Sequence, residues 1–105
     1  MQFIETPVFT RSVQRHLADD AYRALQLALV LRPEQGTVIP GGAGVRKMRW
    51  ASKGRGKRGG LRVIYYWAGD SETFYMLYVY SKNQQQDLTA RQIRTLARFV
   101  REELK

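Results

Sequence analysis

The sequence contains no cysteine and a single histidine, His16, among its 105 residues. Without cysteine the chain has no disulfide framework, no thiolate nucleophile and no cysteine-based zinc or iron–sulfur site. A nuclease that uses one imidazole as base and a second as acid is also excluded, because there is only one imidazole. We expect His16 to be a surface or helix-end residue. An absence of cysteine is typical of a reducing cytoplasm, which is the localisation that we expect.

Long hydrophobic runs are also missing. No stretch approaches the roughly 18 apolar residues of a membrane span, and residues 1–12 lack the basic segment and apolar run of a secretion signal. We therefore expect a soluble, unexported protein that does not bind a membrane. With 44% hydrophobic residues, including 12 aromatic ones, the chain has enough apolar material for a single packed domain over residues 1–105.

Acidic residues are absent from the middle of the chain, where no Asp or Glu occurs from Gln35 to Gly69. A solvated helical face normally interleaves acids with bases, so bases without acids indicate that a polyanionic partner supplies the countercharge. The formal net charge of +9 points the same way. A solvated basic loop with no specific use is the alternative. Within 17 positions this stretch contains Arg46, Lys47, Arg49, Lys53, Arg55, Lys57, Arg58 and Arg62.

The hydrophobic pattern predicts helices towards both ends of the chain and strands in the middle. Thr6 followed by Pro7 is typical of a helix start, and Thr89 caps a helix near the C-terminus. We expect an α+β fold in which two N-terminal helices and a C-terminal helix pack on one face of an antiparallel β-sheet and leave the other face open. The expected elements are a strand over 1–5, helices over 7–17 and 19–32, strands over 45–51, 61–68 and 73–80, and the helix after Thr89.

The glycine-rich segment from Ser52 to Gly60 is the predicted hairpin loop between two strands. Its glycines allow backbone N–H groups and long cationic side chains to approach phosphates closely. Residues 54–59 spell GxGxxG, but a strand follows them, whereas the dinucleotide fingerprint requires a helix. The nine acids are scattered and none lies in the basic centre, so we expect no metal site and no cofactor.

Any phosphodiester cleavage by this chain must therefore use Lys, Arg and Tyr. RNA supplies its own nucleophile, the 2′-hydroxyl, so the protein need only align it, neutralise the charge and protonate the leaving oxygen. Arg62 begins a strand directly after the basic loop, where it could form a bidentate pair with a phosphate. Tyr66 shares its face and Tyr80 ends the neighbouring strand, so either could stack on a base or donate a proton. Core packing is the alternative for both tyrosines.

Three more cations belong to this predicted site. Lys47 and Arg49 share one face of the adjacent strand, and Lys82 follows the last strand. Together they could surround a phosphate. A lysine crowded by other cations has its ammonium form disfavoured, which would favour a neutral amine that can take a proton.

The run GGAGVRKMRWASKGRGKRGGLRVIYYW, the strand ending YVYSKNQQQDL and the C-terminal helix resemble the HigB-like branch of the RelE toxin superfamily. The likeness spans nearly the whole chain. It implies the same helices-on-sheet fold, in the toxin of a type II toxin–antitoxin system. It further implies a hydrolase that inhibits translation, an mRNA interferase that enters the ribosomal A site and cuts mRNA without metal. A cognate antitoxin with a DNA-binding, helix-turn-helix domain is the implied partner.

The resemblance also implies roles for single residues. Arg62 matches the arginine that stabilises the phosphate charge, Lys47 and Arg49 match a basic pair of which one acts as base, and Lys82 matches a cation after the last strand. Typical RelE toxins carry an acid/base tyrosine in the stretch that corresponds to 84–89, and this chain has none there, which leaves a lysine or Tyr66 as the acid. The expected catalytic residues are Arg62, Lys47, Arg49, Lys82 and Tyr66, and the expected RNA-binding residues are Lys53, Arg55, Lys57, Arg58 and Tyr80.

Two other classes of function remain open. ParE-like proteins share the fold and resemble gyrase inhibitors without the catalytic cations, and a plain RNA- or ribosome-binding module would do no chemistry. Both predict that Arg62→Ala leaves toxicity largely intact or changes it only through binding. A nuclease should instead lose cleavage and keep most of its ribosome affinity, because many other cations supply that affinity.

Overall fold

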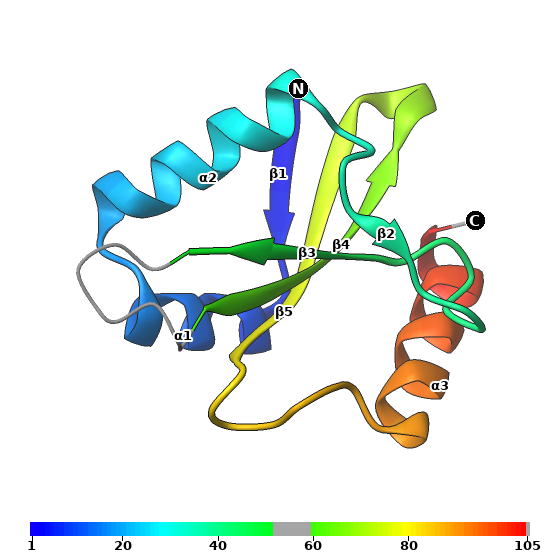
Figure 1. Cartoon of the computed structure of the whole chain (residues 1–105). Helices are drawn as coiled ribbons and strands as arrows, with labels where there is room; N and C mark the ends of the chain where they lie inside the picture. The colour runs from blue at the N-terminus through cyan, green and yellow to red at the C-terminus, as the bar shows by residue number, and fades with distance from the viewer. Residues whose placement is uncertain (52–59, 105) are drawn as a thin grey trace.

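The computed structural model describes residues 1–51 and 60–104. The order of helices and strands is the predicted one, with a short extra strand before the basic segment (Figure 1). The elements are β1 (Gln2–Glu5), α1 (Pro7–His16), α2 (Asp19–Leu31), β2 (Thr37–Val38), β3 (Arg46–Trp50), β4 (Leu61–Ala68), η2 (Gly69–Ser71), β5 (Thr73–Ser81), α3 (Ala90–Phe99) and η3 (Val100–Leu104).

Both predicted helix caps are present. The Thr6 side chain accepts a hydrogen bond from the Phe9 N–H at 3.0 Å, and Pro7 occupies the first turn of α1. Thr89 and Gln92 form a reciprocal capping box at the start of α3, which satisfies two N–H groups that the helix itself cannot. His16 is the last residue of α1, as expected for a helix-end histidine.

The sheet has five strands in the order β1-β5-β4-β3-β2 and is mixed, so the prediction of a purely antiparallel sheet was wrong. β1 runs parallel to β5, with Gln2 opposite Thr73, and the other pairs are antiparallel. A parallel pair requires a long connection between its strands, and here both N-terminal helices and three strands lie between β1 and β5. The extra strand β2 adds two residues at the opposite edge of the sheet.

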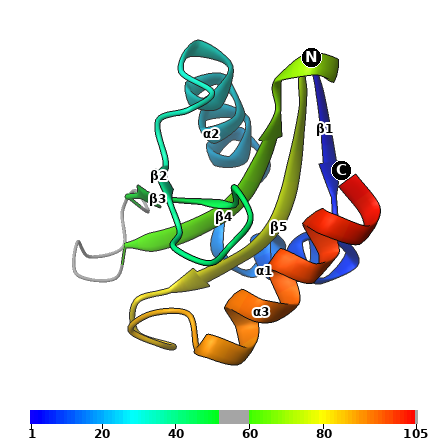
Figure 2. The same cartoon turned by 90° about the vertical axis from the view of Figure 1, so that its right-hand side faces the viewer.

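Helices cover both faces of the sheet, which corrects the prediction of one open face. Figure 2 shows α1 and α2 on one side and α3 on the other. On the α3 side, Ile64, Leu77 and Tyr80 form a buried cluster with residues that include Val100, and Ile93 and Leu96 pack against it. The apolar side chains on both faces of β5 account for this arrangement, because each face needs a cover.

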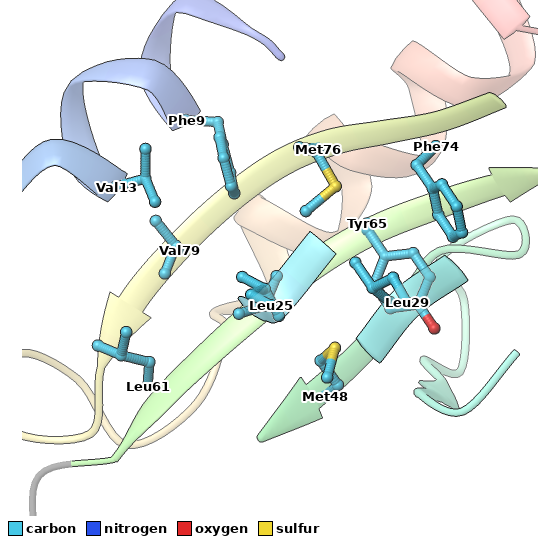
Figure 3. Close-up of a cluster of buried hydrophobic side chains, with 11 residues drawn as sticks. Phe9, Val13, Leu25, Leu29, Met48, Leu61, Tyr65, Phe74, Met76 and Val79 are labelled. Carbon is cyan, nitrogen blue, oxygen red and sulfur yellow. The ribbon is translucent and has the colours of Figure 1, made fainter. Parts of the chain in front are cut away.

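The larger core lies between α1, α2 and the sheet (Figure 3). Phe9 and Leu25 from the helices and Phe74 from β5 are completely buried there. Tyr65 anchors the segment after α2, because its hydroxyl donates to the Pro33 carbonyl at 2.8 Å and accepts from the Gly36 N–H at 2.9 Å. This core packs against one face of β3, β4 and β5, and the other face carries Lys47, Arg49 and Arg62 beside the α3 cluster.

Candidate phosphate-binding site

Two arginines and a tyrosine form a row across three neighbouring strands. Arg49 on β3 pairs directly with Arg62 on β4, and Arg62 pairs with Tyr80 on β5. Directly opposed residues have their Cβ atoms about 5 Å apart on the same face, and like charges in such positions repel. Arg49 is exposed and Arg62 is half-buried. A pair of this kind favours an anion bound between the two guanidinium groups.

Lys47 lies beside this row, opposite Ile64 and two residues before Arg49 on the same strand face. Its ammonium donates a hydrogen bond to Asp87 Oδ1 at 3.1 Å, in an ion pair that joins β3 to the segment before α3. The same carboxylate oxygen accepts from the Leu88 N–H at 2.9 Å. This cation beside the arginine row is therefore paired with an acid.

The pKa of Asp87 is lowered, first by the hydrogen bond from Lys47 and then by that from the Leu88 N–H. Burial opposes this lowering, and the Lys47 and Arg62 charges add to it. Asp87 is thus ionised at neutral pH. The sequence analysis missed this residue. The available signal was that Asp87 is the only acid between Glu72 and Glu102.

The Arg62 guanidinium makes few contacts with the described part of the chain. A guanidinium carries five N–H donors, and here one of them donates a long bond of 3.5 Å to the Leu61 carbonyl. Within residues 1–51 and 60–104, Arg62 makes no ion pair. Its remaining donors have no partner among the described residues, which suits a bidentate pair with a phosphate.

Lys82 follows the end of β5, two residues after Tyr80 of the row. Its N–H donates to the Gly60 carbonyl at 3.2 Å, and its exposed side chain therefore leaves the backbone close to the start of β4, where Arg62 lies. The structure thus brings together four of the predicted site residues, Arg62, Lys47, Arg49 and Lys82. The predicted RNA-binding residues Lys53, Arg55, Lys57 and Arg58 lie outside the described residues.

Arg46 shows that not every base of the cluster belongs to this site. Its side chain donates to the Glu34 and Gly36 carbonyls at 3.0 and 2.8 Å, and it lies 3.9 Å from the Glu34 carboxylate. These contacts tie the segment after α2 to β3. Arg46 is therefore a structural residue on the α2 side of the sheet.

Tyr66 lies away from the arginine row along β4, which does not favour the predicted role of acid. It lies four residues from Arg62 along β4, about 13 Å at the rise of a strand, and pairs with Tyr75. Its ring packs against the segment before β3, where a Cβ at Gly44 would lie 3.1 Å from it. Tyr66 and Arg62 therefore share a face of β4 but lie towards opposite ends of the strand.

Tyr80 lies in the arginine row but is 1% exposed. A ring at this depth offers no face to a base, which conflicts with the expectation of stacking. Burial raises the pKa of Tyr80, the Asp87 charge raises it further and the Arg62 charge lowers it, so the hydroxyl keeps its proton at neutral pH. Tyr80 thus contributes a neutral hydroxyl.

Carboxylates do not gather around this row. In the part of the chain that the structure describes, no group of three or more His, Cys, Asp or Glu side chains could hold a metal ion. The same residues include no helix long and apolar enough to cross a membrane. The described chemistry is therefore that of a cationic surface with one carboxylate and one buried hydroxyl beside it, which suits the binding of a phosphodiester.

Comparison with known families agrees with this arrangement. The model of the family described as "RelE toxin of RelE / RelB toxin-antitoxin system" matches residues 1–104. The match includes the sheet, all three helices and the whole of the described cationic row. The chain therefore belongs to the RelE toxin family of RelE/RelB toxin–antitoxin systems.

Proposed function

We propose that this toxin is an endoribonuclease of the HigB-like branch, which cuts translated mRNA in the ribosomal A site. The observation that carries the proposal is the row of Arg49 and Arg62 with Lys47 beside it. Three cations lie on one face of β3 and β4, and Arg62, the central residue of the row, uses one donor on the described residues. Such a set fits the pentacoordinate phosphorus of RNA cleavage, which carries more negative charge than the ground state.

In the proposed reaction the RNA 2′-oxygen attacks the adjacent phosphorus and the bond from phosphorus to the 5′-oxygen breaks. Arg62 and Arg49 neutralise the charge that develops on the phosphoryl oxygens. Lys47 is an ammonium in its pair with Asp87, so it is suited to give a proton to the leaving 5′-oxygen rather than to act as base. The Asp87 carboxylate is the anionic proton acceptor that the described part of the site offers to the 2′-hydroxyl.

The proposal also names the partners. Family membership implies a RelB-type antitoxin, and the likeness to HigB-like toxins favours one with a helix-turn-helix domain. The net charge of +9 suits a binding place lined by ribosomal RNA, and such a toxin acts in the cytoplasm, where translation takes place.

Primer extension on a defined mRNA in a reconstituted translation reaction tests this function. We expect new 5′ ends inside codons, formed by the wild type only when ribosomes are present and lost in Arg62→Ala. Arg23→Ala is the matched control, because Arg23 is an exposed arginine of α2 on the opposite side of the sheet. It should cut like the wild type.

Intact mRNA in the presence of ribosomes, together with growth arrest in cells that express the toxin, would contradict a nuclease. That result would favour a ParE-like inhibitor of a host protein such as gyrase. Binding to ribosomes without cleavage would favour a plain ribosome-binding module.

A further inference from the structure

The Tyr80 hydroxyl is the exception among buried polar groups. In the described chain it is the one buried side-chain polar atom without a hydrogen-bond partner. Buried hydroxyls nearly always have a partner, because an unpaired one loses its bonds to water and gains nothing in return. A hydroxyl kept at this position at a cost in stability therefore requires an explanation.

Tyr65 shows that the fold readily satisfies a hydroxyl at the same depth. Both tyrosines are almost completely buried, at 0% and 1% exposure. The Tyr65 hydroxyl makes two hydrogen bonds, to the Pro33 carbonyl and from the Gly36 N–H. The Tyr65 hydroxyl thus stabilises the fold through hydrogen bonds, whereas the Tyr80 hydroxyl makes no such contribution in the described chain.

The surroundings of Tyr80 are those of the phosphate-binding site. Tyr80 lies directly opposite Arg62 in the β4–β5 ladder. Asp87, which Lys47 holds, acts on the hydroxyl with its charge, as Arg62 does with the opposite sign. The ring also lies against Tyr78 at 5.6 Å between centroids, and Tyr78 donates to Gln85. Arg62 and Asp87 are therefore the charged groups of the site that act on the hydroxyl.

We propose that the Tyr80 hydroxyl donates a hydrogen bond to the scissile phosphate bound at Arg62, and that the phosphate reaches this donor when the Lys47–Asp87 pair opens. This inference rests on the proposed nuclease function. A phosphate brings the same negative charge as the Asp87 carboxylate, so it competes with Asp87 for the Lys47 ammonium. The pair is exposed enough to separate, with the Asp87 side chain 69% accessible. Its opening gives the bound phosphate access to the neutral hydroxyl.

The substitution Tyr80→Phe tests the proposal, because it removes the hydroxyl and keeps the ring. Single-turnover cleavage of mRNA on ribosomes and thermal unfolding are measured for Tyr80→Phe, Tyr65→Phe and the wild type. We expect Tyr80→Phe to cleave roughly 100-fold more slowly, the usual effect of losing one donor to a transition-state oxyanion. Its unfolding midpoint should equal or exceed that of the wild type, since an unpaired hydroxyl is removed.

Tyr65→Phe is the matched control and should show the reverse pattern, with a lower unfolding midpoint and an unchanged cleavage rate. A third measurement is affinity for ribosomes programmed with mRNA that carries a 2′-deoxynucleotide at the cut site. Tyr80→Phe should keep that affinity within about threefold, so that the loss falls on kcat rather than on binding.

Cleavage by Tyr80→Phe at the wild-type rate would overturn the inference and leave the nuclease function intact. A lower unfolding midpoint in Tyr80→Phe, like that expected of Tyr65→Phe, would also overturn it, since the hydroxyl would then serve the fold. Absence of cleavage by the wild type would remove the proposed function and this inference with it.

Discussion

The substitution Asp87→Asn removes the one carboxylate of the site and keeps the shape of the side chain. Its effect on stability should be small, because the Lys47 and Asp87 side chains are 32% and 69% exposed. Exposed ion pairs contribute about 0.2–1 kcal/mol to the free energy of unfolding. We therefore expect Asp87→Asn to lose less than about 1 kcal/mol at pH 7.

The loss should depend on pH in a defined direction. The pKa of Asp87 is lowered in the folded protein, so its ionised form stabilises the fold at pH values above the ordinary aspartate pKa of 3.8. That stabilisation disappears as the pH falls through the lower, folded value. Urea unfolding at pH 7 and below pH 3.8 gives the free energies of unfolding of wild type and variant. The difference between these free energies should disappear in acid. Asp70→Asn is the control, because Asp70 has no ion pair among the described residues.

A difference of several kcal/mol at pH 7 would refute this reasoning. A difference that stays constant into acid would do the same, because it could not come from the ionised carboxylate. Cleavage adds a second test, since the proposed reaction uses Asp87 as proton acceptor. Asp87→Asn should cut more slowly while it binds RNA at least as tightly, because the site has lost a negative charge.

Two further predictions concern the fold around the site. Gly36→Ala should lower the free energy of unfolding by about 1–3 kcal/mol in urea unfolding, because its Cβ would lie 2.9 Å from the Tyr65 ring and 3.1 Å from the Lys47 carbonyl; an unchanged midpoint would contradict the packing described. Arg49→Ala should change stability by no more than about 0.5 kcal/mol, since it removes an exposed cation that faces Arg62. Its cleavage rate should nevertheless fall, and equal rates for variant and wild type would exclude Arg49 from the site.

Local signals in the sequence predicted the local structure. The caps at Thr6 and Thr89 marked the starts of α1 and α3, and alternation along β4 placed Arg62 on the face opposite Tyr65. No local sequence signal predicted the parallel pairing of β1 with β5, since it joins residues about seventy positions apart. The sequence did not predict which face of β5 the helix α3 covers, because a strand that is apolar on both faces can pack against a helix on either one.

The same distinction applies to the site. Arg49 and Arg62 were predictable as cations on neighbouring strands, because the register follows from a single hairpin. Tyr66 was misplaced because alternation gives the face of a strand and not the position along it. Asp87 was missed because its partner Lys47 lies 40 residues away in the chain. Tyr80 needed the structure, since burial and an unpaired hydroxyl cannot be recognised from residue type.

The rate of a single round of cleavage on the ribosome tests the central claim most directly. Wild type and Arg62→Ala are compared on the same programmed ribosomes, at concentrations that give both proteins equal occupancy. We predict that Arg62→Ala cuts roughly 100-fold or more slowly, because it lacks the main countercharge to the phosphate in the transition state. Equal cleavage rates for the two proteins at matched occupancy would contradict the account.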